Sequence, residues 1–338
     1  MASAEGRLSA AALLCLAATC AQAQTIAIPE IVVTPNYTPT ELSRIGSSVS
    51  VVRSDVIERT SPGSVAQVLR SVPGVTVIES GGPGGSTDVR LRGAETGHTV
   101  VLIDGVRIND ISSARGDFDF ASIALNDIER VEILRGPQSA VYGSDAMGGV
   151  VNIITRRQAA KASATATVEV GSYGTHAERA AVGMRAGDFN LRFNAANYHS
   201  DGFSRRGNRD SDEPDASDKT TAGLRLTYTP DSGARVDLNL DGLHQRSEYD
   251  SPGSGGQNAP NVATRDRYSG SLRFAAPTID DWFDQSITGF FTTQEKLNRE
   301  PGGALPENAS AATNLGAEYR GVATLPLGTL TFGGRIEN

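Results

Sequence analysis

Two stretches rich in acidic side chains are the part of this sequence best suited to binding a metal ion. They span residues 201–218 and 246–265, and each separates two segments of strand-like alternation. Calcium takes six to eight oxygen ligands and tolerates irregular geometry, so carboxylates from two neighbouring loops can form a site. An acidic, solvated loop surface is the alternative. The oxygen-bearing side chains concerned are those of Asp201, Asp210, Asp212, Glu213, Asp215, Asp218, Tyr249 and Asp250.

No other residues of the chain form a pattern that indicates catalysis. The four histidines are scattered, and no His, Ser and acid arrangement resembles a triad. The glycine run 81–85 lacks a Lys or Thr in phosphate-loop spacing and precedes no helix, so it predicts an exposed loop. The formal net charge of −8 gives no support for nucleic-acid binding. We therefore expect no enzyme, no catalytic cofactor and no nucleic-acid partner.

The elements that carry the acidic stretches are strands with strict two-residue alternation. In residues 189–195 every odd position is apolar and every even one polar, and the same period recurs at 222–229 and 235–241. A soluble sheet with one buried face could show this period. The polar face, however, carries Arg, Asp, Asn and Thr along whole strands, which favours a transmembrane β-barrel with lipid outside and water inside.

Connection lengths support the barrel. We place nine strands near 163–170, 177–186, 189–200, 219–229, 234–245, 266–275, 282–296, 310–325 and 329–338. The second, fourth, sixth and eighth connections are tight and the others are longer, as in barrels with short periplasmic turns and long extracellular loops. A closed barrel that holds a plug-sized domain needs about 22 strands. Because the chain ends mid-strand at Asn338, we expect a C-terminally truncated, incomplete barrel over residues 158–338.

The N-terminus predicts export. Residues 10–18 form a short apolar core, and Ala21-Gln22-Ala23 after it suits signal-peptidase cleavage, so residues 1–23 are predicted to be a signal peptide. Both cysteines, Cys15 and Cys20, lie within it. The mature chain therefore has no thiol for a disulfide or a Cys metal site.

Residues 36–157 predict a compact α/β domain. Ser64 and Gln67 form a capping box before an apolar helical face, which ends at Pro73-Gly74. Residues 75–78 predict a strand, and residues 100–108 predict a buried hairpin whose Asp-Gly pair suits a type I′ turn.

Residues 131–155 predict a strand, a Gly-Pro turn, a short helix, a glycine turn and a second strand. Three side chains here could contact a ligand, but they more simply tie down a glycine-rich backbone: Arg135, Tyr142 and Asp145.

These segments resemble a known family. Arg135-Gly136-Pro137, Val141-Tyr142-Gly143 and residues 148–155, with Leu102-Ile103-Asp104-Gly105 upstream, are similar to the plug domain of TonB-dependent outer-membrane receptors. Residues 69–75 and 91–93 fit the same pattern. The stretch 24–35 contains a segment that resembles the TonB box, which the energy-coupling protein TonB pulls on: Glu30, Ile31, Val32, Val33, Thr34 and Pro35.

Within the family, residues 135–155 are most similar to the cobalamin (vitamin B12) receptors, and Tyr249-Asp250 resembles their calcium- and ligand-binding loop. The resemblance implies cobalamin contacts at Ser86, Asp88, Glu95, Ser113, Ala114 and Tyr249. It implies calcium ligands at Asp210, Asp212, Asp215, Tyr249 and Asp250, although Ser204 stands where an Asp is expected.

The resemblance also implies a function. We expect TonB-dependent active transport of cobalamin across the outer membrane, with substrate bound by plug apices and extracellular loops. The partners would be TonB, cobalamin or another large scarce nutrient, and outer-membrane lipid. Two alternatives stay open: a ferric-siderophore receptor, and a non-transporting structural or adhesive barrel. The TonB-box-like segment favours transport, because an extended strand can add to a partner's sheet edge.

Overall fold

A computed structural model describes most of the chain. The described residues are 31–32, 40–60, 64–80, 84–110, 112–113, 116–123, 127–158, 160–204, 214–250, 261–279, 282–301 and 307–338. Within this part, no helix is long and apolar enough to cross a membrane.

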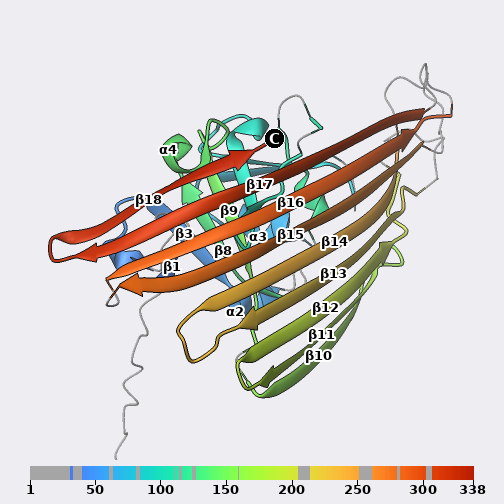
Figure 1. Cartoon of the computed structure of the whole chain (residues 1–338). Helices are drawn as coiled ribbons and strands as arrows, with labels where there is room; N and C mark the ends of the chain where they lie inside the picture. Colours follow the sequence, from blue (N-terminus) through green and yellow to red (C-terminus); the bar gives the residue numbers. More distant parts are fainter. Residues whose placement is uncertain are drawn as a thin grey trace, which may run out of the picture.

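A curved sheet of nine antiparallel strands makes up the C-terminal half, and each strand pairs with its neighbours in sequence (Figure 1). The predicted number of strands is thereby confirmed. The strands are β10 Ala162–Val170, β11 His176–Ala186, β12 Phe189–Ser200, β13 Ser217–Tyr228, β14 Arg235–Tyr249, β15 Asn261–Ile279, β16 Phe283–Arg299, β17 Glu307–Leu325 and β18 Gly328–Glu337.

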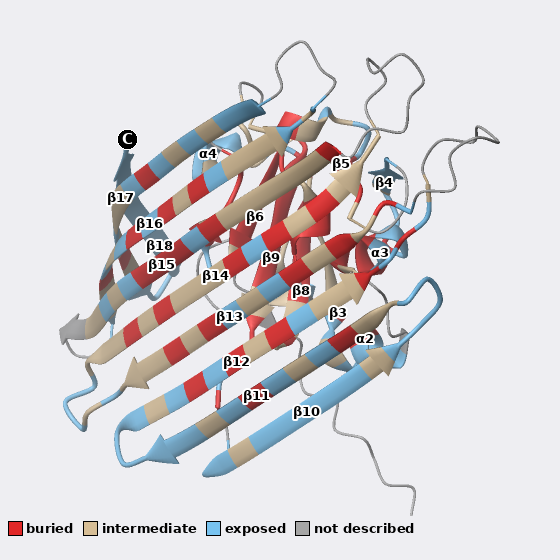
Figure 2. Cartoon of the chain, turned by 90° about the vertical axis from the view of Figure 1, so that its right-hand side faces the viewer, coloured by how far each residue is buried: buried red, intermediate tan, exposed pale blue. Residues whose placement is uncertain are grey.

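The two faces of this sheet differ as the alternation predicts. On β12, Leu191 and Phe193 are exposed, whereas Arg192 and Asn194 between them are each only 5% exposed. Figure 2 shows the same banding of buried and exposed positions along the middle strands. The polar face is buried because the N-terminal domain packs against it. Along β12 and β13, polar groups of this face contact the N-terminal domain, as Arg192 does with Asp127 and Arg225 with Asp104.

The alternation of short and long connections is confirmed, but two strand ends were misplaced. Only residues 187–188 and 326–327 separate β11 from β12 and β17 from β18. The predicted loop 246–265 is shorter than expected, because β14 continues to Tyr249 and β15 begins at Asn261, directly opposite it. The outer ends of β14 and β15 still pair residue by residue through alternating polar side chains. Hydrogen bonding between the two strands does not require an apolar face.

The N-terminal domain contains a five-stranded sheet in the order β3-β8-β9-β6-β7, in which only β6 and β9 run parallel. Its bounds are β3 Ser48–Arg53, β6 Thr99–Ile103, β7 Val106–Arg107, β8 Ile128–Arg135 and β9 Gly149–Thr155. Two two-stranded sheets accompany it: β1 Ile31–Val32 with β2 Thr40–Glu41, and β4 Val75–Glu79 with β5 Thr87–Leu91. The helices are α2 Ser54–Thr60, α3 Val65–Arg70 and α4 Ser139–Tyr142, with short 3₁₀ turns η1 Leu42–Arg44, η2 Thr96–His98 and η3 Phe120–Ser122.

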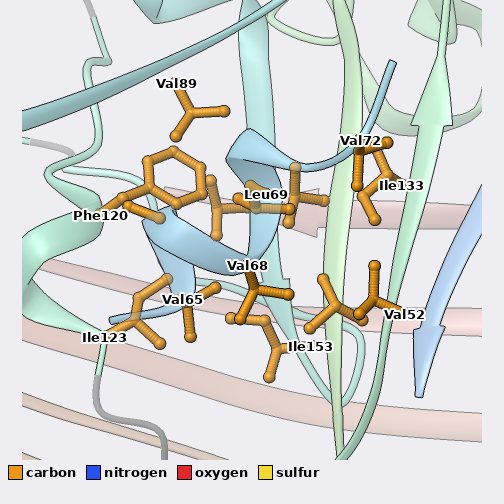
Figure 3. Packing of buried hydrophobic residues seen from close by; sticks show 14 of the residues in the cluster. Val52, Val65, Val68, Leu69, Val72, Val89, Phe120, Ile123, Ile133 and Ile153 are labelled. Carbon is orange, nitrogen blue, oxygen red and sulfur yellow. The ribbon is translucent and has the colours of Figure 1, made fainter. Parts of the chain in front are cut away.

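Helix α3 lies at the centre of the apolar core of the N-terminal domain, which we call the plug. The Ser64 hydroxyl accepts a hydrogen bond from the Gln67 amide at 3.3 Å, as the capping box predicts. The apolar face of the helix packs between Phe120 and Val89 on one side and Ile133 and Val52 on the other (Figure 3). Leu69 is completely buried, and burial of such a side chain contributes about 1.5–3 kcal/mol.

The other predicted elements of the plug lie where the sequence placed them. Asp104 and Gly105 both have positive φ (49° and 85°), as a type I′ hairpin requires, and they join β6 to β7. Residues 99–102 on β6 are at most 1% exposed, which confirms a strand buried on both faces. The predicted strand, short helix and strand over 131–155 correspond to β8, α4 and β9.

Candidate functional site

A pocket of 680 Å³ lies where the plug meets the ends of β14, β15 and β16 that carry the long connections. We call this end of the sheet the outer end, and the pocket the outer pocket. The plug contributes four residues to its lining, and the strand ends contribute the rest. The lining consists of Ser80, Gly84, Ser86, Asp119, Gln245, Ser247, Tyr249, Asp250, Ala263, Thr264, Arg265, Lys296, Asn298 and Glu300.

The β4–β5 hairpin brings the plug up to the barrel wall. The Ser80 amide donates to the Ser86 carbonyl at 2.9 Å, which closes the end of the hairpin. Gly84 has φ of +79°, and a Cβ there would lie 2.2 Å from the Ser217 hydroxyl of β13. Glycine is therefore required at this position for both its conformation and the close approach.

Asp119 joins three elements at the floor of the outer pocket. One carboxylate oxygen accepts hydrogen bonds from the Thr87 amide at 2.9 Å and the Ala121 amide at 3.0 Å. The other accepts from the Arg265 guanidinium on β15 at 2.8 Å. This single side chain thus fixes β5, η3 and the barrel wall relative to one another.

The other charges of the outer pocket are also mostly paired. Lys296 forms an ion pair with Asp110 of the plug, and the Tyr249 hydroxyl donates to Glu300 at 2.8 Å. Asp250 Oδ2 is buried and has no hydrogen-bond partner among the described residues. The pocket is therefore polar, with its two basic side chains already neutralised by plug carboxylates.

The structure brings together some of the predicted binding residues and separates others. Ser86, Tyr249 and Asp250 all line the outer pocket. Tyr249 is the last residue of β14, not a loop residue as predicted. Asp88, Glu95 and Ser113 are not among the lining residues. Ala114 lies outside the described residues.

The three residues away from the pocket lie elsewhere on the plug. Asp88 is on β5 and pairs with Ile78 in the hairpin. Glu95 precedes η2, and its carbonyl accepts from the His98 amide at 3.0 Å. The Ser113 amide donates to the Asp110 carbonyl at 3.3 Å, in the turn that also supplies the partner of Lys296.

Partial burial raises the pKa of Asp88. The guanidinium of Arg90 opposes this effect, whereas the carboxylates of Asp117 and Asp119 add to it. The carboxylates of Asp117 and Asp119 therefore disfavour a further negative charge near the floor of the outer pocket.

The predicted calcium ligands are only partly placed. Asp210 and Asp212 lie outside the described residues. Asp215 is 7% exposed and Asp250 lines the outer pocket. Within the described ranges, no group of three or more His, Cys, Asp or Glu side chains is arranged to hold a metal ion.

The predicted TonB box is also partly described. Ile31 and Val32 form β1, which pairs antiparallel with β2 through only two residue pairs. Glu30, Val33, Thr34 and Pro35 lie outside the described residues.

Of the three plug side chains predicted to tie down the backbone, Arg135 bonds a backbone carbonyl, whereas Asp145 and Tyr142 contact other side chains. Arg135 donates to the Pro73 carbonyl and, at 2.9 Å, to the Ser50 hydroxyl, so it joins β8 to β3 and to the end of α3. Asp145 forms an ion pair with Arg107. Burial would raise the pKa of Asp145, but the hydrogen bond and charge of Arg107 outweigh it and the pKa falls. Tyr142 packs against the second apolar cluster of the plug.

Buried ion pairs hold the plug against the barrel wall. Arg225 on β13 contacts Asp104 of the plug at 2.8 Å and Asp241 on β14 at 2.8 Å. It also donates to the Thr155 hydroxyl at the end of β9, again at 2.8 Å. Arg192 on β12 makes a second ion pair, with Asp127 of the plug, and both side chains are under 10% exposed.

Sequence reasoning missed the charged residues of the outer pocket. Arg265 was assigned to a loop, because the start of β15 was placed near residue 266. Lys296 and Glu300 lie at a strand end that was placed only approximately. Continuing the two-residue alternation outward from Arg267, which is 6% exposed, would have placed Arg265 on the inner face.

Comparisons with known proteins agree with this architecture. The sequence model described as "TonB-dependent Receptor Plug Domain" matches residues 41–150. A relative named Vitamin B12 transporter BtuB, from Photobacterium profundum, is 42% identical over 164 residues. That match covers 47% of this chain and 27% of the relative, so the chain matches little more than a quarter of the relative's length.

Solved structures share the fold. The siderophore receptor PirA from Acinetobacter baumannii has a TM-score of 0.68 at 21% identity, over 85% of this chain and 47% of that chain. The copper transporter OprC has a TM-score of 0.71 at 19% identity, over 86% and 45%. The ferric citrate transporter FecA has a TM-score of 0.69 at 20% identity, over 86% and 47%. These relatives are named as transporters or receptors. Residues 41–150 therefore match the sequence of a TonB-dependent receptor plug domain, and the chain shares its fold with about half of each of these solved receptors and transporters.

Proposed function

We propose that the receptor takes up cobalamin by TonB-dependent active transport, with the outer pocket as part of the substrate site. The observation that carries this proposal is the 42% identity to a vitamin B12 transporter over 164 residues. The outer pocket supports it, because two predicted contacts, Ser86 and Tyr249, come from different domains and line the same cavity.

A ferric siderophore is the second candidate substrate. Arg265 and Lys296 favour it, because basic side chains attract anionic ligands. Each of them, however, already contacts a plug carboxylate, Asp119 and Asp110 respectively. The pocket therefore offers little unbalanced positive charge, which supports a substrate recognised through neutral polar groups.

Equilibrium binding to the complete receptor tests the substrate. We expect tight binding of cyanocobalamin, and a loss of about tenfold, or roughly 1.4 kcal/mol, in Tyr249→Ala. Tyr268→Ala is the matched control, because Tyr268 is 55% exposed on the same sheet and does not line the pocket. Weak cyanocobalamin binding beside tight siderophore binding would reverse the assignment.

TonB coupling is proposed for the segment Glu30 to Pro35. The ladder between β1 and β2 has only two residue pairs, so the segment can leave it at small cost and add to a partner's sheet. Val33→Pro removes a main-chain donor and fixes φ. We expect it to abolish uptake and preserve binding, whereas Asn36→Pro, beyond the segment, keeps both. Normal uptake by Val33→Pro would favour the alternative of a non-transporting structural or adhesive barrel.

Calcium is proposed as a structural ligand near Asp250. The residues present fit an oxygen-binding cation: Asp250 Oδ2 and Asn261 Oδ1 are both buried without hydrogen-bond partners within the described chain. Asn261 is directly opposite Tyr249 in the ladder. Asp210, Asp212, Asp215 and Tyr249 would complete the set, and the ion would hold β14, β15 and the preceding loop together before substrate arrives.

Chelation tests this proposal. Cobalamin affinity is expected to fall when calcium is removed, and Asp250→Ala should abolish that dependence. The matched control is Asp231→Ala, at a short turn on the opposite end of the sheet. Direct calcium binding, measured without substrate, separates a failed calcium site from a wrong substrate. An affinity that does not respond to chelation would leave these acids as ordinary loop charge.

A further inference from the structure

Arginine side chains gather on the inner face of the sheet at the end opposite the outer pocket. Asp237 on β14 is directly opposite Arg273 on β15, and directly opposed residues of antiparallel strands point to the same face. In the neighbouring row, Arg235 is opposite Ala275, Ala275 opposite Ser286, and Ser286 opposite Arg320. Arg157, just after β9, reaches the same place from the plug side. We call Arg157, Arg235, Arg273 and Arg320 the arginine cluster.

The carboxylate inside the cluster, that of Asp237, already accepts several hydrogen bonds, most of them at Oδ1. It accepts from Arg157 at 2.7 Å, from Arg235 at 2.9 Å and from the Thr227 hydroxyl at 2.8 Å. Its side chain is 2% exposed. Two guanidinium groups therefore share one negative charge, and none of the hydrogen bonds to Asp237 comes from a third.

Arg273 is that third guanidinium. Its Nε is buried without a hydrogen-bond partner, and the side chain makes no hydrogen bond or ion pair with any described residue. The charges that act on it are those of Arg320, Arg235 and Arg157, all of the same sign, and that of Asp237. A partly buried cation among like charges is unfavourable unless an anion or water satisfies it.

The cluster faces open space. Arg235, Arg273 and Arg320 line a cavity of 1310 Å³ between the plug and strands β14 to β18. Small-molecule sites typically measure about 300–1,000 Å³, so the space is large enough for a sizeable group. Ser286 and Gln285 add neutral hydrogen-bonding groups to the same lining, which also includes the carboxylates of Glu41, Asp284 and Glu318.

We propose that this cluster is an oxyanion-binding site at the short-turn end of the lumen, centred on Arg273. A planar guanidinium without a partner offers paired N–H donors in the geometry that phosphate and phosphodiester oxygens accept. Two sources have this chemistry: free phosphate, and the phosphodiester of a cobalamin molecule leaving between plug and wall. The second source rests on the proposed function, and the first does not.

Binding of inorganic phosphate to the complete receptor, measured by calorimetry without any corrinoid, tests the site itself. We expect Arg273→Gln to weaken phosphate binding by about tenfold or more, and Arg273→Lys to weaken it less, because lysine keeps the charge but loses the paired donors. Arg185→Gln is the matched control, since Arg185 is an exposed arginine near a short turn and does not line the cavity.

The melting temperature distinguishes loss of the phosphate site in Arg273→Gln from misfolding of that variant. In phosphate-free buffer Arg273→Gln should raise the melting temperature, because it removes repulsion, whereas loss of a structural contact would lower it. Phosphate should then raise the melting temperature of the wild type more than that of the variant. The site is disproved if the wild type does not bind millimolar phosphate, or if both proteins bind it equally.

Uptake then separates the two sources. If the substrate phosphodiester occupies the site, Arg273→Gln should slow uptake of cobalamin and leave uptake of cobinamide, which lacks the phosphodiester, unchanged. If free phosphate occupies it, only phosphate binding changes. If cobalamin is not the substrate, the difference in uptake is not expected. The effect of Arg273→Gln on phosphate binding is still expected.

Discussion

The plug core and the contact between plug and barrel are stabilised in different ways. In the core, Leu69 and Ile133 are fully buried among apolar side chains. In the contact, the buried Arg225 and Asp104 form a charged group with the partly exposed Asp241. Apolar burial is non-directional and depends on excluding water. Ion pairs need a specific geometry, but their groups can be solvated if water reaches them.

This difference determines which contacts of the plug can be exchanged for water. A plug that moves within the barrel keeps its own core, because separating apolar surfaces exposes them to water. Its contacts with the wall can instead be exchanged for water. Under the proposed transport function, the polar inner face of strands such as β12 to β14 therefore suits a domain that must be held firmly and still be displaced.

The largest effect is expected from breaking the contact on one side only. Arg225→Met leaves the buried Asp104 and the partly exposed Asp241 without their cation and should destabilise the docked plug by about 3–5 kcal/mol. Hydrogen exchange should rise at β9 and at the turn around Asp104, and not at α3.

Neutralising the partners as well sharpens this test. The triple change Arg225→Met, Asp104→Asn and Asp241→Asn should recover part of the lost protection, because no unpaired charge remains. Unchanged exchange in Arg225→Met would mean that this ion pair does not hold the plug.

A core substitution should act elsewhere and somewhat less strongly. Leu69→Ala creates a cavity and is expected to cost about 2–5 kcal/mol. Exchange should rise across α3, β4 and β5, while β9 stays protected by the wall. Leu327→Ala, at a fully exposed turn, is the control. Equal deprotection of both regions would show that plug core and contact form one cooperative unit.

Loss of the helix cap should have a moderate effect confined to the core side. Ser64→Ala removes the acceptor for the Gln67 amide and should cost about 1 kcal/mol. Ser64→Asp keeps an acceptor and should retain most of the stability. Exchange at the first turn of α3 reports both variants, and identical rates would contradict the role of the cap.

The smallest effect concerns pH. The pKa of Asp88 is raised in the folded protein, so its stabilising contribution is complete below its ordinary pKa and is lost as pH rises through the folded value. Asp88→Asn should therefore stabilise the β4–β5 hairpin slightly at neutral pH and make no difference near pH 3. A melting-temperature profile against pH measures this, and destabilisation at neutral pH would show that the carboxylate is needed.

Local signals predicted most of the fold. The capping box at Ser64 placed α3, the Asp104-Gly105 pair placed the β6–β7 hairpin, and side-chain alternation gave the number and facing of the barrel strands. Each depends on residues a few positions apart. The outer ends of β14 and β15 were missed, because the two strands pair there through polar residues, such as His244 with Asp266 at 2.7 Å, and not through an apolar face.

The contacts in the outer pocket were less predictable, because they join residues that lie far apart in the sequence. Ser86 and Tyr249 came from family resemblance and do share a pocket. The pairing of Asp119 with Arg265, which lie 146 residues apart, depends on how the plug rotates within the barrel. No local pattern carries that information, since any inward-facing arginine could meet any plug carboxylate.

The pairing of Arg225 with Asp104 also bears on how proteins with this fold can diversify. A plug transferred into a barrel without an arginine at that place would bury an unmatched carboxylate, and the reverse exchange would bury an unmatched cation. Loops beyond the strands can change one at a time, whereas the wall and the plug surface must change in compensating steps. New substrate specificity should therefore arise more readily by recombining loops than by exchanging whole domains.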